Sequence, residues 1–422
     1  MPSAPSAVRT AAIAIVIGVN YGYFGAAMAG AQLYLSPRLG LSVGEQGTLF
    51  AVPVLGMFLG VLAANRIVTT AGRRATLLAM ALATAVLGAA SPLVADLVWI
   101  DGTRLLIGVA MGVTTVVVPI YIAEAAPPAG RGRIAVLYQV ATVGGIVAAF
   151  LVAYALSAAG LWRVMLGVTA PVGAVCVALL LRAPDTVAGL GPRRERGPGA
   201  VAELFGPRYR VVTGFVVVLG ALVQLTGISA VSNFSPRIFE GMGYRGPFAL
   251  LILPAVVQLC GLLAALASSA TVDRFGRRAT LLTGTAVMAA GHALLVAAFA
   301  APRGATALGL AGLLTFTVGF NAGLGSLLWI YASEGYTDRL RSAGATALLL
   351  PNLAANFLLA QFFLGAMTTL GGATTFAALL AVTVASWLYL FRHAPETRGR
   401  TLDEIHEYWQ NGRTWPRPVA SD

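Results

Sequence analysis

Long apolar stretches separated by short polar segments dominate this chain. A search for runs of about 20 apolar residues, the length that crosses a bilayer as a helix, finds twelve candidate spans. They lie at roughly residues 10–35, 44–68, 75–95, 100–124, 134–158, 163–182, 210–239, 247–270, 279–300, 305–332, 342–367 and 373–392. The pattern predicts an all-α membrane protein with twelve transmembrane helices.

The same polar landmarks occur once in each half of the chain. The heptapeptide GRRATLL is found at residues 72–78 and again at 276–282. Two Glu–Arg pairs, each seven residues apart, also match: Glu124 with Arg131 and Glu334 with Arg341. A duplicated membrane unit is typical of transporters with a site between their halves, so we expect two pseudo-symmetric six-helix bundles. The predicted parts are a bundle at 1–182, a cytoplasmic linker at 183–209 with a short surface helix near 200–205, a bundle at 210–392 and a cytoplasmic tail at 393–422.

Composition narrows the class of protein further. Of the 422 residues 58% are hydrophobic and only 10% charged, against a usual charged share of about 25%. A soluble surface of this size would need more charge. The two cysteines lie in apolar runs and the three histidines are scattered, so we expect no disulfide framework, metal or cofactor. Without a nucleophile–base pair, an enzyme is the least expected class.

The basic residues are all arginine, and their distribution predicts the topology. Arg104 lies in or near a span, five arginines fall on one side, and the remaining 22 fall on the side shared by the termini and the linker. By the positive-inside rule, both termini and the linker are cytoplasmic in a protein of the cell (inner) membrane. Topology thus accounts for the net charge of +12, and we expect no nucleic-acid partner.

Charged residues cluster where helices are expected to end on the cytoplasmic side. Bidentate Arg–carboxylate pairs are strong and directional, so these residues are candidates for a latch that holds the cytoplasmic gate shut when the site faces outward. The alternative is that the charges are solvated and serve topology alone. In the first half Thr69 and Thr70 stand where the second half has Asp273 and Arg274, which predicts a weaker first latch. The candidates are Arg73, Arg74, Glu124, Arg131, Asp273, Arg277, Arg278, Glu334, Arg341 and Glu396.

Several motifs occur in a fixed order along the chain. They are Arg104-(x)3-Gly108-(x)3-Gly112, PIYIAEAAPPAGRG at 119–132, QLTGI at 224–228, DRFGRR at 273–278 and PETRGRTLDEI at 395–405. Their order and spacing resemble the major facilitator superfamily and, within it, the sugar porter family. The resemblance implies the major facilitator fold and an alternating-access carrier of a small solute, expected to be a monomer in the lipid bilayer.

The resemblance also implies the position of the substrate site. Polar side chains inside a span are costly unless they face a cavity or another helix, and a tryptophan face can stack on a ring. The alternative for each amide is an interhelical hydrogen bond, and for the helix 1 aromatics it is packing. A helix break at Gly227 would expose carbonyl groups to a ligand. The candidate substrate contacts are Gln139, Gln224, Ser229, Asn233, Trp329, Asn352 and Asn356, with Tyr21 and Phe24 from helix 1.

The chain departs from the family pattern mainly in this site. Phe24 occupies the position of the aspartate that couples protons in proton-linked members, and Val223, Ser229 and Asn233 replace polar residues of the seventh helix. Fewer groups therefore remain to satisfy the hydroxyls of a sugar. Arg104, the counterpart of the arginine that faces the aspartate, must lie near the outer water, pair with Asp101 or backbone carbonyls, or bind an anionic substrate group.

Three functional hypotheses remain open. The first is a sugar-porter-like facilitator or weakly proton-coupled carrier, because no carboxylate lies near the middle of a span. The resemblance also implies that the helix of His292 is a peripheral support helix. The second is an exporter of a less polar metabolite or drug-like compound on the same fold. The third, a non-transporting nutrient sensor, is disfavoured by the short tail.

Overall fold

The computed structural model describes residues 7–126, 131–183, 199–301, 305–337 and 339–415. It contains twelve helical segments long and apolar enough to cross a membrane, from Val8–Leu39 to Gly372–His393, which confirms the predicted class of fold. Several spans consist of more than one helix because the chain bends within them.

The first half holds six spans. Its helices are α1 (Ala7–Leu39), α2 (Val43–Ala71), α3 (Arg73–Ala90), α4 (Leu97–Ala125), α5 (Arg131–Ala155), the short η2 (Ser157–Ala159), α6 (Trp162–Gly167) and α7 (Thr169–Leu181). Helices α6 and α7 together form the sixth span. Within this half α1 packs on α5, α2 on α4 and α3 on α7.

The second half repeats the plan after α8 (Gly199–Leu204), the short helix expected in the linker. Its helices are α9 (Arg210–Leu225), α10 (Ile228–Asn233), α11 (Ser235–Gly241), η4 (Phe248–Ile252), α12 (Leu253–Phe275), α13 (Arg277–Ala300), α14 (Thr306–Ala322), α15 (Leu324–Glu334), α16 (Arg341–Thr369), α17 (Gly372–His393) and α18 (Leu402–Gln410). Within this half α13 packs on α14 and α17, and α9 on α16.

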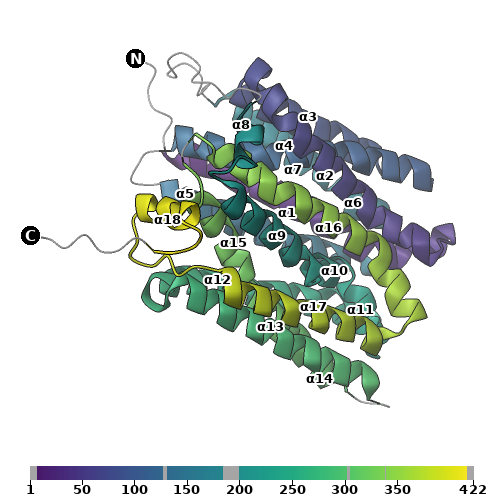
Figure 1. Cartoon of the computed structure of the whole chain (residues 1–422). Coiled ribbons are helices and arrows are strands. Elements are labelled where there is room, and N and C mark those ends of the chain that lie inside the picture. The colour runs from purple at the N-terminus through teal and green to yellow at the C-terminus, as the bar shows by residue number, and fades with distance from the viewer. Residues whose placement is uncertain (1–6, 127–130, 184–198, 302–304, 338, 416–422) are drawn as a thin grey trace, which may run out of the picture.

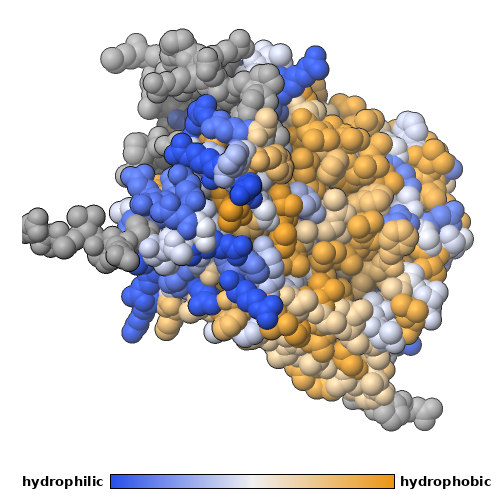
Figure 2. Space-filling view, in the orientation of Figure 1, coloured by the Kyte–Doolittle hydropathy of each residue, from blue (hydrophilic) through white to orange (hydrophobic). Residues whose placement is uncertain are grey.

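The surface matches a protein that lies in a bilayer. In Figures 1 and 2 the helix bundle carries a broad apolar belt, and most of the hydrophilic surface lies at the end that holds α8 and α18. Large apolar side chains within the spans are exposed, among them Leu62 on α2, Val86 on α3 and Leu263 on α12. We call the end with α8 and α18 the linker end, and the opposite end the far end.

The repeated heptapeptide forms the same local structure in both halves. Gly72 and Gly276 each take a positive φ, 83° and 95°, and the following arginine begins α3 or α13. An added side chain at Gly276 would also displace the Glu396 carboxylate. Glycine is therefore favoured at this position both by the positive φ and by the close approach of Glu396. This equivalence confirms that the chain consists of two related halves.

The two halves meet along pairs of helices that come one from each. Helix α2 packs on α16, α5 on α12, and α1 on α10 and α11. In the first half α4 approaches α2 so closely that added side chains at Gly108 and Gly112 would overlap the α2 backbone at Pro53 and Met57. Small residues permit such approach between helices in membranes, where packing replaces the hydrophobic effect.

Candidate functional site

A cavity of about 220 Å³ lies between the two halves. Its walls come from α1, α2, α4 and α5 on one side and from α10, α12 and α16 on the other. Candidates from the sequence that line it are Tyr21, Phe24, Arg104, Ser229, Asn233 and Asn356. Residues about 330 positions apart therefore converge on one hollow, as expected for a site between duplicated bundles.

An interruption of the seventh span builds the wall of the second half. Helix α9 ends at Leu225, Gly227 takes a left-handed conformation with φ of 95°, and α10 begins at Ile228. Glycine adopts this conformation without strain, so the expected break occurs at this residue. The short α10 then presents Ser229 and Asn233 to the cavity.

A hydrogen-bonded chain of side chains holds this wall from behind. Ser229 Oγ donates to Gln224 Oε1 at 2.6 Å, and Gln224 Nε2 donates to Asn352 Oδ1 at 3.2 Å. Asn352 Nδ2 in turn donates to the Gly220 carbonyl at 3.1 Å. Gln224 and Asn352 thus make interhelical hydrogen bonds and are not among the residues that line the cavity.

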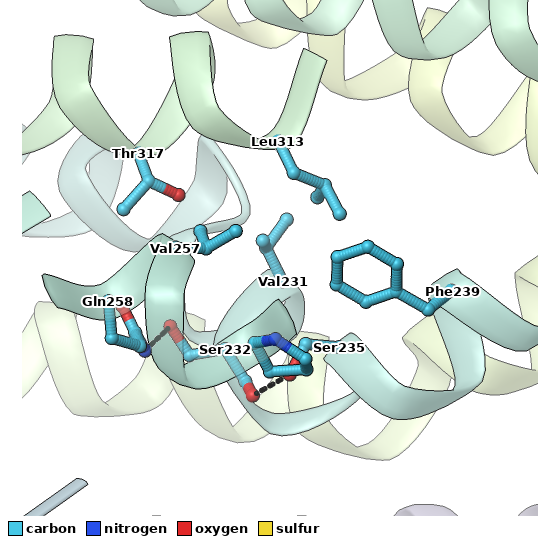
Figure 3. Close-up of a pocket in the computed structure, with 9 residues that line it drawn as sticks. Val231, Ser232, Ser235, Phe239, Val257, Gln258, Leu313 and Thr317 are labelled. Atoms are coloured by element: carbon cyan, nitrogen blue, oxygen red, sulfur yellow. Dashed lines mark hydrogen bonds between the residues drawn. The ribbon is translucent and has the colours of Figure 1, made fainter. Parts of the chain in front are cut away.

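Gln258 is a cavity residue that the sequence argument passed over. It projects from α12, and its Nε2 donates to Ser232 Oγ at 3.1 Å, as Figure 3 shows. Both residues also border a small adjoining pocket, in which Ser235 donates to the Ser232 carbonyl. The signal was present, because Gln258 is an amide inside an apolar span, the same criterion that selected Gln224. On α16, in the same wall, Asn356 Oδ1 is buried and has no hydrogen-bond partner among the described residues.

The wall of the first half is aromatic and cationic. The guanidinium of Arg104 lies 4.7 Å from the centroid of the Phe24 ring, a cation–π contact. Arg104 is only 4% exposed, and within the described part of the chain it makes no hydrogen bond or ion pair. In the described part of the structure, neither outer water nor backbone carbonyl groups therefore stabilise the Arg104 charge, although both were expected as alternatives. Asp101 interacts with Arg104 only at longer range.

Two candidates lie apart from the cavity. Gln139 is exposed, and Trp329 on α15 is 45% exposed; neither lines the hollow. On α5, Gln139 precedes the cavity residues Thr142 and Ile146 by three and seven positions, so it lies on a similar side of the helix but one to two turns nearer the start of α5.

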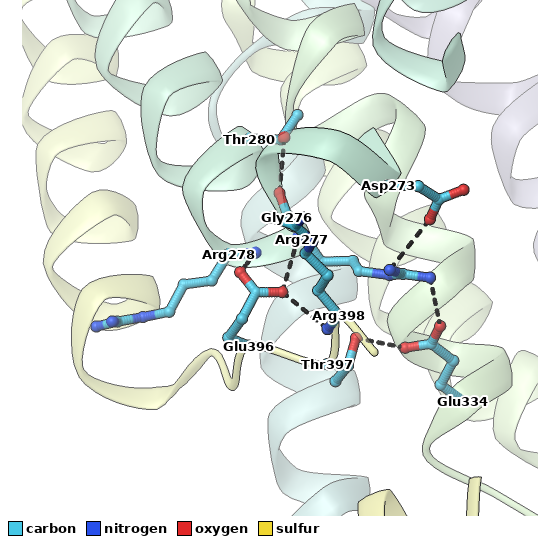
Figure 4. A network of polar contacts seen from close by, with 9 residues as sticks. All are labelled: Asp273, Gly276, Arg277, Arg278, Thr280, Glu334, Glu396, Thr397 and Arg398. Atoms are coloured by element: carbon cyan, nitrogen blue, oxygen red, sulfur yellow. Dashed lines mark hydrogen bonds and ion pairs between the residues drawn. The ribbon is translucent and has the colours of Figure 1, made fainter. Parts of the chain in front are cut away.

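The charged cluster of the second half centres on Arg277 (Figure 4). Its guanidinium lies 3.1 Å from Asp273 and 3.6 Å from Glu334. The Arg277 and Glu334 side chains are 19% and 17% exposed, whereas that of Asp273 is 80% exposed. The contact with Glu334 is therefore the more protected of the two from solvent screening.

Glu396 acts on the backbone in this cluster. Its carboxylate accepts from the amides of Arg277 at 2.9 Å and Arg278 at 3.1 Å, the first two residues of α13 (Figure 4). A carboxylate at this position satisfies free amides and favours the positive end of the helix dipole. The Arg278 side chain reaches the Phe391 carbonyl at 2.6 Å, near the end of α17. Glu396 is thus a helix cap, a role that differs from the Arg–carboxylate pair expected for it.

The first half has a corresponding cluster. Arg73 pairs with Glu124 at 2.9 Å, and Arg74 donates to the Leu180 and Leu181 carbonyls near the end of α7. Arg74 and Arg278 therefore play equivalent roles in the two halves. The side chain of Arg131 lies outside the described residues, and Arg341 donates to the Ser333 carbonyl at 3.3 Å.

In this conformer the ion pairs described above join helices of the same half. Arg73 begins α3 and reaches the end of α4, while Arg277 begins α13 and reaches the end of α15. The sequence predicted such pairs at neighbouring helix ends in each half, as a latch that holds the cytoplasmic gate shut when the site faces outward. The pairs of Arg73 with Glu124 and of Arg277 with Glu334 lie at those helix ends, and the latch itself stays a prediction.

Contacts between the halves are found at the far end. Gln361 on α16 donates to the Gly44 carbonyl at 3.3 Å and accepts from Thr48 at 3.4 Å. The rings of Phe50 and Phe234 lie 4.6 Å apart, nearer the cavity. The hydrogen bonds join α2 to α16, and the ring contact joins α2 to Phe234, the residue that follows α10.

Comparisons with known proteins found a matching family model, similar sequences and a similar fold. The family model described as "Sugar (and other) transporter" matches residues 8–190 and 191–409. The chain is 28% identical over 439 residues to the galactose-proton symporter of Escherichia coli strain K12, covering 95% of this chain and 94% of that one. It is also 28% identical over 465 residues to the glucose facilitated diffusion protein of Zymomonas mobilis, covering 96% and 97%. The inward open conformation of the xylose transporter XylE from E. coli superposes with a TM-score of 0.80 at 21% identity, covering 96% of this chain and all of that one.

Proposed function

The chain belongs to the sugar transporter family, a family of membrane transporters and not of enzymes, and from this premise we propose that it carries a monosaccharide-sized solute by alternating access. The observation that carries the proposal is the cavity between the two halves. Hydroxyl and amide groups from Ser229, Asn233 and Gln258 face the aromatic wall of Tyr21 and Phe24 across it. A sugar has the matching chemistry, with hydroxyls around its edge and an apolar ring face.

The proposed mechanism is a rocking motion of the two halves about this site. The contacts of Gln361 and Phe50 join the two halves at the far end, and they would break when the site turns to that side. The charged clusters would keep the linker ends of the helices together within each half, so that each half moves as a unit. The arginine distribution favours a cytoplasmic linker end, so the far end would face outward.

We propose facilitated diffusion as the mode of transport. No aspartate or glutamate is among the described residues that line the cavity, and Phe24 stands where an acid would meet Arg104. His292 is fully buried, bonds Thr383 through Nδ1 at 3.1 Å and packs on Phe316, which favours a structural role. The similar proteins include both a proton symporter and a facilitated diffusion protein, at the same 28% identity, and so leave the mode open.

Transport into vesicles tests both parts of the proposal. Purified protein in proteoliposomes should take up labelled monosaccharides faster than empty vesicles, and collapse of a pH gradient should leave the initial rate unchanged. Accumulation against a gradient under imposed external acid would show proton coupling and refute facilitation. Asn233→Ala should lower the apparent affinity, whereas Gln139→Ala, which also removes a side-chain amide but at an exposed position that does not line the cavity, should not.

A further inference from the structure

Arg104 has unused binding capacity at the surface of the cavity. Arg104 lines the hollow, yet the residue is only 4% exposed, and its buried Nε has no hydrogen-bond partner in the part of the chain that the structure describes. A guanidinium carries five N–H donors, and within the described residues its close contact is the stacked ring of Phe24. A buried charge without hydrogen-bond partners is unfavourable, so this site favours an anion that can accept those donors.

The charge of the cavity lining is positive. Among the described residues that line it, Arg104 is the sole charged side chain. Asp101, one turn earlier on α4, acts on Arg104 at longer range and is not part of the lining. Its Oδ1 is itself buried without a hydrogen-bond partner, so the two side chains do not satisfy each other.

The groups on the opposite wall indicate which other chemical groups the anionic ligand would have. Ser229, Asn233, Asn356 and Gln258 present hydroxyl and amide groups there, and Asn356 Oδ1 lacks a partner. A ligand that spans the cavity would place an anionic group on the first half and hydroxyl groups on the second. At about 220 Å³ the hollow is smaller than the roughly 300–1,000 Å³ of drug-binding pockets, which suits a monosaccharide-sized ligand.

We propose that the transported solute is a small polyhydroxy carboxylate, a sugar acid, whose carboxylate binds Arg104. This inference rests on the proposed transport function and specifies its substrate class. A carboxylate carries one charge and matches the single guanidinium in a bidentate geometry. A phosphate ester carries up to two charges near neutral pH, and the lining offers no second cation to balance them.

Two sugars that differ in one group provide the test. D-galacturonate carries a carboxylate where D-galactose carries a hydroxymethyl group, and calorimetry on the purified full-length protein can compare their affinities. We expect wild-type protein to bind D-galacturonate at least tenfold more tightly. Arg104→Gln should bring the ratio to about one. Arg163→Gln is the matched control, because Arg163 also stacks on an aromatic ring, that of Trp162 at 4.8 Å, but lies outside the cavity.

A second variant tests the inference in case Arg104→Gln does not fold. Phe24→Asp would set a carboxylate against the guanidinium and fill its donors from within, so D-galacturonate binding should fall at least tenfold. Equal binding of the two sugars by wild-type protein, or a preference that survives both substitutions, would overturn the inference and leave the transport proposal intact. Tighter binding of D-galactose 6-phosphate than of D-galacturonate would overturn the choice of carboxylate. Failure of the vesicles to transport any of the three would overturn the proposed function as well.

Discussion

Removal of the Gln224 side chain should weaken substrate binding although this residue does not line the cavity. Gln224 holds the Ser229 hydroxyl through a hydrogen bond of 2.6 Å, and Ser229 faces the cavity. Because its proton is donated to Gln224, the Ser229 oxygen can offer the substrate only its lone pairs, and without Gln224 the hydroxyl rotates freely and this acceptor is no longer held in place. A hydrogen bond contributes about 1 kcal/mol, which corresponds to about a fivefold loss of affinity.

The size of the loss in a double variant reveals how Gln224 acts. Ser229→Ala removes the hydroxyl itself and should also cost about fivefold. If Gln224 acts by orienting Ser229, the double variant should lose about fivefold as well, because the second change removes an interaction that is already lost. If Gln224 contacts the substrate independently, the losses should multiply to about 25-fold.

The assay is equilibrium binding to purified protein, with initial-rate uptake in proteoliposomes as a second measurement. Gln139→Ala is the control, since it removes the same side chain from an exposed position outside the cavity. A multiplicative loss in the double variant, or full affinity in Gln224→Ala, would refute the positioning role.

Three further predictions concern the gate, the cap and the charge of the substrate. Cysteines placed at Thr48 and Gln361, whose side chains lie 3.4 Å apart, should crosslink under oxidation and stop transport until a reductant is added; transport by fully crosslinked protein would rule out opening at the far end. Glu396→Ala should lower the free energy of unfolding by about 1–2 kcal/mol, because it removes the cap of α13; chemical denaturation in detergent measures this change. The control Asp273→Ala, at a side chain that is 80% exposed, should change the free energy of unfolding by less than about 0.5 kcal/mol. Equal losses in the two variants would contradict the capping role. If the carrier is a uniporter of monoanions, an inside-negative potential of 100 mV, set with potassium and valinomycin, should lower steady-state D-galacturonate uptake about 50-fold. The potential opposes entry of each negative charge by about 2.3 kcal/mol, and D-galactose uptake should be unaffected. No response of D-galacturonate uptake would mean that a cation is co-transported.

The broad outline of the candidate site could be predicted from particular residues. The break at Gly227 followed from glycine in an apolar span, and the cavity positions of Ser229 and Asn233 followed from the motif that contains it. Trp329 and Gln139 do not line the cavity, because a motif gives a residue's helix but not the depth or the face at which that helix borders the cavity. Gln258 was missed because it belongs to no motif.

The charged clusters, too, could be predicted from the sequence only in part. Their residues and their duplication were evident in the sequence, and Arg277 does meet Glu334. That Glu396 caps α13, and that Arg74 and Arg278 reach carbonyls near the ends of α7 and α17, depends on how neighbouring helix ends are placed. Sequence spacing carries no information about that placement.

Hydrophobicity along the chain and the internal repeat determined the twelve spans, the two halves and the class of protein, because the bilayer requires long apolar helices and duplication leaves matching local motifs. Tertiary packing alone decided which polar groups meet in the hollow between the halves. Contacts of that kind depend on helix rotation and tilt, which are set by side-chain packing between helices distant in sequence. The Arg104 guanidinium against Phe24 is the clearest example: each residue is visible in the sequence, but only the folded chain brings the charge to the cavity wall, where Nε has no hydrogen-bond partner among the described residues.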